Sequence, residues 1–565
     1  MNGTEIPSQP DGSDRLAHRG GPDFPGNGGI SGPDGSTPVR DEIGSLGCAG
    51  CSSRCPRGDA HLRGFRTWEY TTARREDGAV AKSSTTRRLI AASAAATALC
   101  LGVTGCSRPI NGIPTASGSP AADTVAGLPV SDGPSGLKPG AAPAELPVEG
   151  GTDDDVDRLA VDTVADVQRY WRQSYPKTFD EGRFRPVSRL VSYDSGGQGR
   201  RLCGQDTSGR ANAFYCPGQD TIAWDRGRLL PELRNTFGPM AVVTVLAHEM
   251  GHAVQHRAGL LDGDTPTLVA EQQADCLTGS FFRHVAEGSA EHLRVSTGDG
   301  LNSVLGVLSY IRDAPGETGF ADSRAHGSAF DRISAFQYGF NDGPKRCTEM
   351  TESSVLERTT QFRFWKKAQE SDLPIDEDSI ERVERSLRRV FADTGIAPPR
   401  ISTERGSCPD GTNTEPAAYC AETNTVSLDR QRLEELATPP HGGDEPSGYG
   451  DFAAYAQVAS RYVLAVQRAA GLSLTGEAAG LRTACLVGAW SGLLVEDPLG
   501  RRNPVGKLRL APGDIDEGVA ALLDENGLIA ADVRGEQVSA GFARVEAFRL
   551  GFRKGITPCA TEYHS

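Results

Sequence analysis

The run VVTVLAHEMGHAVQH, residues 242–256, is the most informative part of this chain. It is apolar enough for a buried helix and contains the segment HEMGH, from His248 to His252. Residues four apart share one helix face, about 6 Å from each other, so both imidazoles can reach one tetrahedral Zn²⁺. Glu249 is turned by about 100° from His248, which places its carboxylate beside a water at the metal. The spacing predicts two metal ligands and a general base.

A second predicted helix carries EQQAD, from Glu271 to Asp275. These two carboxylates are again four residues apart on one face. One carboxylate from this helix can complete the three protein ligands of an open catalytic zinc site, and the other can accept the second ring N–H of a ligand histidine. HEMGH alone is also compatible with two core histidines on a helix. The second helix favours the metal site, because two helices that cross at one ion account for all five residues.

Four stretches of the first half of the chain match four stretches of the second half, in the same order. They are ANAFYCPGQDTIAWDRGRL from Ala211 with EPAAYCAETNTVSLDRQRL from Glu415, LAHEMGHAVQHRAGL from Leu246 with VASRYVLAVQRAAGL from Val458, ADCLTGSF from Ala274 with TACLVGAW from Thr483, and AFQYGFNDGPKRC from Ala335 with AFRLGFRKGITPC from Ala547. This indicates a tandem duplication. We expect one domain over 153–350, a connector over 351–372 and a second copy over 373–565.

Each copy opens with an amphipathic helical pattern, over 156–171 and 380–391. A short β region follows in both, where alternating residues after a cysteine end in Asp-Arg, which predicts a small β-hairpin. The remainder reads as helices. The expected fold class is α+β, mostly helical, present twice.

The second copy lacks the chemistry of the first. In register, His248, Glu249, His252, Glu271, Asp275 and His326 become Ser460, Arg461, Leu464, Gly480, Ala484 and Val538. None of these replacements is a usual zinc ligand or a proton carrier at neutral pH. We therefore expect a degenerate, non-catalytic copy, whose former cleft, lined by Leu464, Gly480 and Ala484 near Arg461, could hold a protein partner or recruit substrate.

The first copy resembles the bacterial neutral zinc metallopeptidase family, a gluzincin-like group. The resemblance covers about 153–347 and rests on Tyr215-Cys216-Pro217 with Asp225, the HEMGH helix, the segment from Glu271 to Cys276, and His326-Gly327. It implies a zincin-like domain that hydrolyses peptide bonds with one Zn²⁺ per chain, held by His248, His252 and Glu271. It further implies Glu249 as general base and Asp275 as the partner of a ligand. His326 would contact the tetrahedral intermediate, and a solvent-exposed loop histidine is the alternative.

The cysteines suggest export. Apart from Cys106, eight cysteines follow residue 106, four in each copy, and an even number in an exported protein favours disulfides. Sequence alone does not fix the connectivity. If each copy folds alone, the repeat narrows it to Cys203–Cys216, Cys276–Cys347, Cys408–Cys420 and Cys485–Cys559.

Residues 87–106, RRLIAASAAATALCLGVTGC, have the layout of a bacterial lipoprotein signal. Cys106 would carry the lipid and anchor the protein on the outer face of the cytoplasmic membrane; an uncleaved anchor is the alternative. Residues 107–152 are rich in Pro, Gly and Ala and predict a flexible tether. A signal peptide normally begins within a few residues of its charged region, but 86 residues precede Arg87. We therefore expect translation to begin at Val80, residues 80–106 to be the signal, and residues 1–79 to be disordered or untranslated. The cluster CAGCSSRC, residues 48–55, is a weak alternative metal site.

A net charge of −15 and a pI near 5.3, without a Lys/Arg-rich block, argue against a nucleic-acid partner. The predicted partners are a peptide or protein substrate and the membrane. The predicted function is an exported, membrane-anchored zinc metallopeptidase. A non-catalytic cell-surface binding or scaffold lipoprotein with a vestigial peptidase fold is the alternative.

Overall fold

The computed structural model describes residues 124–564, except 180–181, 317, 319, 321, 323–324, 359–371, 405–407, 439–447 and 496–507. The predicted signal with Cys106, the segment 1–79 and most of the connector 351–372 lie outside the described residues. We call residues 124–358 the N-terminal region and residues 372–564 the C-terminal region. No helix in the described parts of the chain is long and apolar enough to span a membrane.

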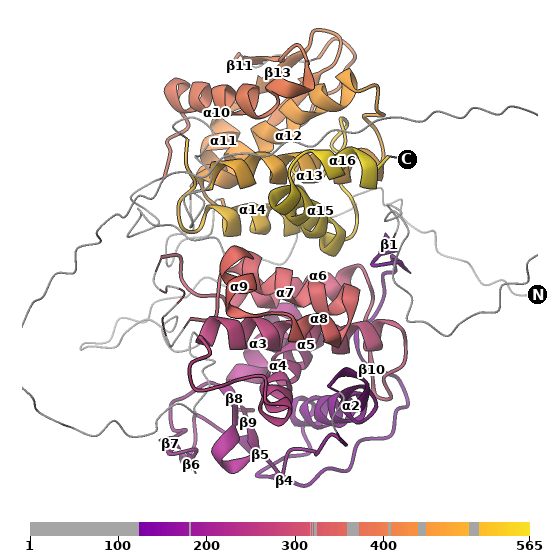
Figure 1. Cartoon of the computed structure of the whole chain (residues 1–565), viewed down its shortest axis with the longest axis vertical. Helices are drawn as coiled ribbons and strands as arrows, with labels where there is room; N and C mark the ends of the chain where they lie inside the picture. Colours follow the sequence, from indigo (N-terminus) through magenta and orange to yellow (C-terminus); the bar gives the residue numbers. More distant parts are fainter. Residues whose placement is uncertain are drawn as a thin grey trace, which may run out of the picture. The chain divides into compact units, whose positions relative to one another are not determined.

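The N-terminal region combines a small sheet with a group of helices (Figure 1). Its strands are β1 (Thr124–Val125), β2 (Leu128–Pro129), β3 (Gly136–Leu137), β4 (Val148–Glu149), β5 (Arg189–Tyr193), β6 (Arg201–Leu202), β7 (Gln205–Asp206), β8 (Ala213–Cys216), β9 (Thr221–Asp225) and β10 (Leu293–Arg294). Its helices are α2 (Asp155–Thr178), α3 (Leu229–Phe237), α4 (Pro239–Ala258), α5 (Thr267–Ala286), α6 (Asp299–Tyr310), α7 (Ala329–Asp342), α8 (Pro344–Thr348) and α9 (Glu352–Arg358), with the short 3-10 turn η1 (Pro217–Gln219).

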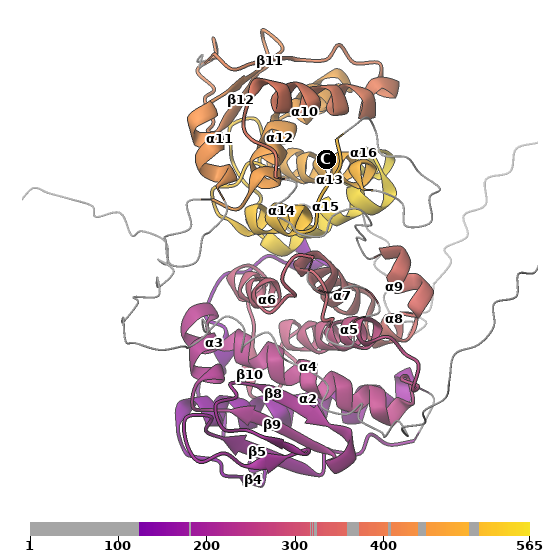
Figure 2. The same ribbon diagram turned by 90° about the vertical axis from the view of Figure 1, so that its left-hand side faces the viewer.

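The main sheet has the order β4-β5-β9-β8, and Figure 2 shows α4 packed over it. Strands β8 and β9 form the expected antiparallel hairpin. The sheet is larger than that hairpin, because β5 pairs with β9 and β4 pairs with β5, both in parallel. These parallel pairs join strands far apart in sequence, and no local turn signal marks them.

Residues 124–152 differ from the expected flexible tether. Strand β3 pairs with β10, and β4 is the edge strand of the main sheet. The backbone N–H of Ala144 donates to Asp162 at 2.7 Å, and that of Ser131 donates to Thr297 Oγ1 at 2.8 Å. A composition rich in Gly and Pro is also typical of an irregular segment whose backbone groups bond to neighbouring elements. Residues 124–152 bond in this way to other parts of the N-terminal region.

Helices α5 and α7 pack at very short distance. A Cβ on Gly279 would overlap the carbonyl of Phe336, and one on Gly339 would overlap the carbonyl of Cys276. Cys276, on α5, is paired with Cys347, on α8. The glycines and this cysteine pair together fix α7 and α8 against α5, the helix that carries EQQAD.

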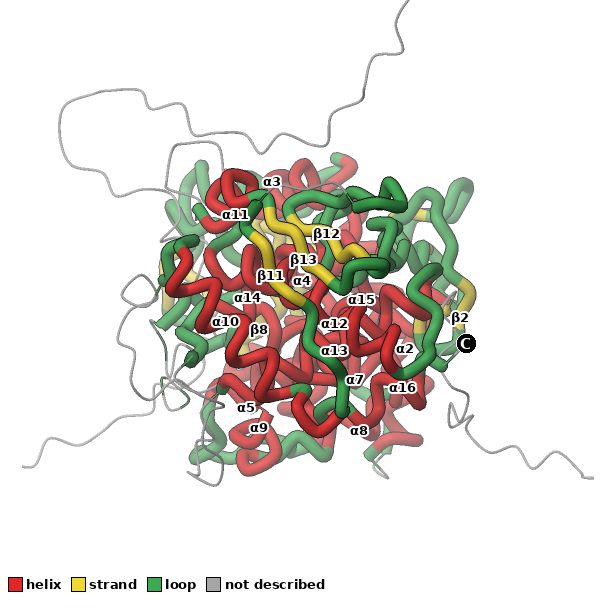
Figure 3. Tube along the Cα trace, turned by 90° about the horizontal axis from the view of Figure 1, so that it is seen from above, coloured by secondary structure: helices red, strands yellow, loops and turns green. Residues whose placement is uncertain are grey.

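The C-terminal region has elements in a similar order. They are α10 (Glu377–Val390), η3 (Ala392–Thr394), β11 (Arg400–Ser402), β12 (Ala417–Cys420), β13 (Thr425–Leu428), α11 (Arg430–Ala437), α12 (Asp451–Ala469), α13 (Glu477–Leu494), α14 (Asp514–Leu523), α15 (Gly541–Lys554) and α16 (Thr557–Glu562). Figure 3 shows β11, β13 and β12 side by side; β11 is parallel and β12 antiparallel to β13. Over the described residues the fold class is therefore α+β and mostly helical, as expected.

The packing of α13 on α15 uses the same devices as that of α5 on α7. Cβ atoms on Gly488 and Gly551 would overlap backbone carbonyls of the facing helix. Cys485 is paired with Cys559, and the two shorter pairs are Cys203–Cys216 and Cys408–Cys420. The structure thus places all eight cysteines in the four pairs that the sequence repeat suggests.

The N-terminal and C-terminal regions contact each other through α6 and α7 on one side and α14 and α15 on the other. The ring of Phe330 lies 5.0 Å from that of Phe552, centroid to centroid. Gln337 donates its side-chain amide to the carbonyl of Phe542 at 2.9 Å. The backbone N–H of Phe330 donates to Asp516 at 3.1 Å. These contacts involve α7, which also supports the candidate site.

Candidate metal centre

Helices α4 and α5 cross closely where the candidate residues lie. A Cβ on Gly251 would lie 3.1 Å from the Cα of Ala274, tighter than ordinary packing. The glycine of HEMGH therefore allows the two backbones to approach. Because α4 is buried over most of its length, its polar side chains must find partners inside the protein.

Three side chains from these helices converge on one point. One donor atom each from His248, His252 and Glu271 lies within 4.8 Å of the others, and all three residues are buried. Glu271 Oε2 is 3.1 Å from His248 Nε2, and Glu271 Oε1 is 3.4 Å from His252 Nε2. Two imidazole nitrogens and a carboxylate form a donor set that suits zinc. The structure thus brings together the three residues predicted as ligands.

Glu271 is held as a carboxylate. Its burial opposes ionisation, but the charge of His252 and the hydrogen bonds from both histidines hold the pKa of Glu271 well below 4.5. A fully buried negative charge that faces two histidines is the arrangement expected before a cation is bound.

Asp275 orients His248, as predicted. Its Oδ1 is 2.8 Å from His248 Nδ1, so the imidazole donates there and keeps the Nε2 lone pair for the opposite side. Asp275 is itself held by Arg332 on α7, whose Nε and Nη2 donate to its two oxygens at 2.9 Å each. Arg332 Nη1 donates to the carbonyl of Ile311 at 3.0 Å. Arg332 was not among the predicted site residues.

His252 has its own support, which the sequence analysis missed. Its Nδ1 is 2.9 Å from Gln255 Oε1, one turn further along α4. Gln255 Nε2 donates to the carbonyl of Ala270 at 2.7 Å and to Gln273 Oε1 at 3.0 Å, both on α5. The amide therefore orients the imidazole and joins the two helices. The sequence contained a signal for Gln255, because Gln467 occupies the matching position in the C-terminal region.

Glu249 lies next to the three candidate ligands. It is buried, and its Oε2 accepts the backbone N–H of Tyr215 on β8 at 2.7 Å. Burial raises the pKa of Glu249 above its usual 4.5, although the neighbouring histidines act in the opposite direction. A carboxylate with a raised proton affinity beside the site is suited to accept a proton from water.

His326 lies in the loop between α6 and α7 and is 4% exposed. The solvent-exposed alternative is therefore wrong. Its Nδ1 is 3.2 Å from Asp313 Oδ1, and Asp313 also accepts the backbone N–H of His326 at 2.8 Å. Burial lowers the pKa of His326, but Asp313 and the charge of Glu271 outweigh it and raise that pKa above 6.5. The charge of Glu271 therefore acts on the imidazole of His326.

In the C-terminal region, Arg461 occupies the position that matches Glu249. Its guanidinium donates to the carbonyls of Asp532 at 2.7 Å and of Leu528 and Ala531 at 2.9 Å each. A Cβ on Gly480 would lie 2.7 Å from the carbonyl of Ala530. The expected open cleft at Leu464, Gly480 and Ala484 is therefore wrong, because Arg461 and the loop that it binds occupy it.

A buried His, His, Glu set on two crossing helices, with the intervening glutamate beside it, defines the class of HExxH metal sites. Residues 132–350 match the model of the family described as "Putative neutral zinc metallopeptidase".

Two relatives of this segment are uncharacterized proteins. One, from Mycobacterium tuberculosis, is 29% identical over 212 residues, which cover 34% of this chain and 69% of the relative. The other, YpfJ of Escherichia coli, is 27% identical over 212 residues, which cover 34% of this chain and 70% of the relative. No solved structure matches the chain.

Proposed function

We propose that the N-terminal region is a zinc-dependent peptidase with one Zn²⁺ held by His248, His252 and Glu271. The observation that carries this proposal is the convergence of these three buried donors beside Glu249. Zinc bound there would polarise the carbonyl of a peptide bond and lower the pKa of a water. The match of residues 132–350 to the model of a zinc metallopeptidase family supports the reaction class.

The proposed work of the chain's own residues follows from their contacts. Glu249 takes the proton of the attacking water and returns it to the leaving amine. The N–H of Tyr215 fixes one oxygen of Glu249, which leaves the other for the proton. Asp275 and Gln255 fix the two ligand imidazoles. His326, with a raised pKa, would donate a hydrogen bond to the oxyanion of the tetrahedral intermediate.

We also propose that the C-terminal region is a duplicated copy of the peptidase domain that has lost its site. The order of elements, the matched cysteine pairs and the glycine contacts support this origin. Gln467 donates to Thr483 Oγ1 at 2.8 Å, which links α12 to α13 as Gln255 links α4 to α5. This copy would serve as a partner of the catalytic region or of another protein, rather than as a second enzyme.

The cellular setting belongs to the same proposal. Paired cysteines support an oxidising compartment, and the lipobox-like segment that ends at Cys106 supports a lipid anchor. The substrate would then be a peptide or protein outside the cytoplasmic membrane.

The substitution Glu249→Gln tests the catalytic role. The amide keeps the size of the side chain but cannot take a proton, so we expect normal zinc content and a loss of peptide hydrolysis of about 10²- to 10⁴-fold in kcat. Release of fluorescent fragments from a general peptide library measures hydrolysis, and elemental analysis measures zinc.

Glu287→Gln, an exposed glutamate at the end of α5, is the matched control and should hydrolyse at the wild-type rate. Equal turnover by Glu249→Gln and the wild-type protein would exclude Glu249 as the base. A zinc-loaded wild-type protein without hydrolysis would favour the binding or scaffold alternative.

A further inference from the structure

A second group of carboxylates lies far from the candidate zinc site, in the C-terminal region. Asp451 is the first residue of α12, and Asp514 and Glu517 lie in the first turn of α14. One oxygen from each lies within 4.8 Å of the others. Asp451 and Asp514 are 6% and 7% exposed. In the repeat alignment Asp451 matches Pro239, so the cluster belongs to the second copy alone.

Each of the three carboxylates is positioned by a backbone amide. The N–H of Leu373 donates to Asp451 Oδ2 at 2.8 Å, that of Ala511 to Asp514 Oδ2 at 2.9 Å, and that of Phe452 to Glu517 Oε2 at 2.9 Å. Gly450 is required here, because a Cβ on this residue would overlap the carboxylate of Glu517. In each of the three side chains, one carboxylate oxygen is therefore held by a backbone N–H, which also limits the orientation of the other oxygen.

One of the remaining oxygens is buried without any partner. Asp451 Oδ1 is inaccessible to solvent and accepts no hydrogen bond. A buried carboxylate oxygen without a partner is costly, and native proteins rarely keep one without an ion, a proton or a water. The unpaired oxygen is evidence separate from the proximity of the three carboxylates, and it points to a cation as its partner.

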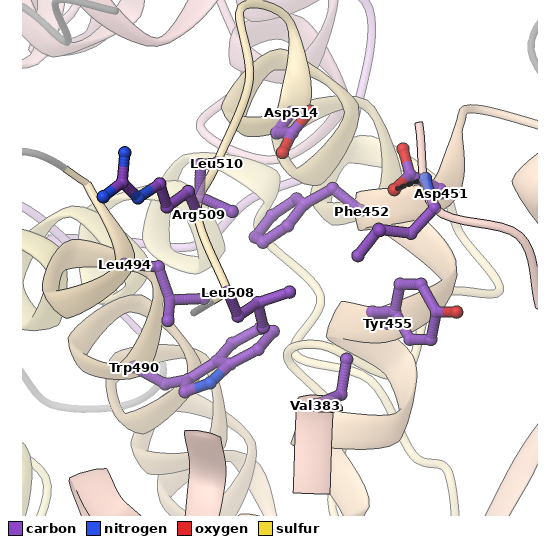
Figure 4. A pocket seen from close by; sticks show the side chains of 11 residues that line it. Val383, Asp451, Phe452, Tyr455, Trp490, Leu494, Leu508, Arg509, Leu510 and Asp514 are labelled. Carbon is purple, nitrogen blue, oxygen red and sulfur yellow. Dashed lines mark hydrogen bonds between the residues drawn. The ribbon is translucent and has the colours of Figure 1, made fainter. Parts of the chain in front are cut away.

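A small pocket, with a volume of about 20 Å³, adjoins the carboxylates. Figure 4 shows Asp451 and Asp514 along one side of it, with Trp490, Leu508 and Val383 opposite. Arg509 also lines the pocket, but Figure 4 shows its guanidinium turned away from both aspartates. A pocket of this size has room for about one water ligand beside the carboxylates.

We propose that Asp451, Asp514 and Glu517 form a binding site for a hard divalent cation of the calcium class. Three carboxylates and no nitrogen or sulfur donor suit a hard cation rather than zinc. Calcium takes six to eight oxygens at about 2.3–2.6 Å in flexible geometry, whereas magnesium usually keeps several waters and only one or two carboxylates. The bound ion would join α12, α14 and the segment at Leu373 that leads into α10.

Burial and the charge of Asp372 raise the pKa of Asp451 to about 6. Burial and the charges of Asp451 and Asp372 raise that of Glu517 to about 8. A shared proton is therefore the competing occupant of the site, and calcium should bind more tightly as the pH rises.

The test uses the exported chain without its signal, loaded with zinc, and CaCl₂ as the only added metal. We expect CaCl₂ to raise the Tm by roughly 5 °C at a concentration well above Kd, and the Tm should continue to rise with the logarithm of the calcium concentration. Terbium, which replaces calcium, should show luminescence sensitised by Trp490, which lines the adjoining pocket. No chelator is used, because it would also remove zinc.

Asp514→Asn and Glu517→Gln should each weaken calcium binding at least about tenfold, which corresponds to about 1.4 kcal/mol. Their Tm without calcium should not fall, because each removes a repelling charge. Glu422→Gln, an exposed residue after β12, is the control and should respond as the wild type does.

The proposal is overturned if up to about 10 mM CaCl₂, above the roughly 10⁻⁴ to 10⁻³ M Kd of weak extracellular sites, changes neither the Tm nor the heat of titration. Equal responses of the wild type and both variants would also overturn it. Tighter binding of MgCl₂ than of CaCl₂ would contradict the calcium assignment. None of these results depends on peptide hydrolysis.

Discussion

Asp275 lies between a histidine and an arginine, and both of its oxygens are in use. It accepts from His248 Nδ1 and from two nitrogens of Arg332, all of them buried. The cost of burying this carboxylate is offset only by keeping both partners. Its effect on the candidate zinc site is therefore indirect, through the orientation of one imidazole.

Asp275→Asn should weaken zinc binding by about 10- to 100-fold without removing a ligand. An amide still bonds to one partner but no longer carries the charge that faces Arg332. Competition with a fluorescent zinc chelator measures the affinity. Asp264→Asn, at an exposed position before α5, is the control and should bind zinc as the wild type does. Unchanged affinity in Asp275→Asn would show that Arg332 and α7 orient His248 without it.

The helical spacing of HEMGH was sufficient to predict His248 and His252, whereas the choice of Glu271 as the third ligand came from the family resemblance of the segment EQQAD. Arg332 and Asp313 could not be found in this way, since each reaches the site only through the packing of α7 and the loop before it. Comparison of the two copies offered a partial signal for Arg332, because Arg544 occupies the matching position. The buried Nε of Arg544 has no hydrogen-bond partner, as expected where the matching aspartate has become Ala484.

At the scale of elements, the helices and the hairpin of β8 and β9 were predictable, and the parallel strands of the sheet were not. Helix α4 and helix α5 follow the apolar runs that surround HEMGH and EQQAD. The parallel pairing of β5 with β9 depends on a crossover between separate strands, for which the chain carries no local signal. The segment 124–152 was misread for a related reason: its order comes from bonds to α2 and β10, not from its own composition.

The carboxylates at the starts of α12 and α14 should make the free energy of unfolding decrease as the pH rises. Burial and neighbouring acids raise the pKa of Asp451 to about 6, that of Glu517 to about 8, and that of Asp514 well above 3.8. Asp372 adds to the repulsion. Because these groups bind protons more tightly when folded, the stability that they contribute is present at low pH and is lost as the pH rises from about 4 towards 8.

In calcium-free buffer, the free energy of unfolding should therefore fall between pH 5 and pH 8 by an amount on the order of 2 kcal/mol. Urea titrations across this range measure it, and Glu517→Gln should flatten the profile. A free energy that rises over the same interval would show that the cluster is ionised and paired in the folded protein.

At the scale of the whole molecule, the C-terminal region contacts the loop that carries His326. Asp516 on α14 accepts the backbone N–H of Phe330 and lies 3.2 Å from Arg312 Nε. These residues lie on either side of Asp313 and His326 in the chain. The C-terminal region is thus placed to hold the loop that carries His326.

Asp516→Ala should lower kcat roughly 3- to 30-fold while zinc content stays normal, because it loosens this loop but touches no candidate ligand. The control is Glu525→Ala, at an exposed position after α14. Hydrolysis of a short peptide and elemental analysis measure the two quantities. If Asp516→Ala hydrolyses as the wild type does, the contact between the regions has no part in catalysis.

The central claim is that one zinc ion binds at His248, His252 and Glu271 and none binds in the C-terminal region. The most direct test is the zinc content of the chain from residue 107 onward, purified without added metal, for the wild type and for His252→Ala. We predict about one zinc per chain in the wild type and close to none in His252→Ala, since a site with two remaining ligands binds weakly. One zinc retained by a folded His252→Ala protein, or two zinc ions in the wild type, would contradict the account.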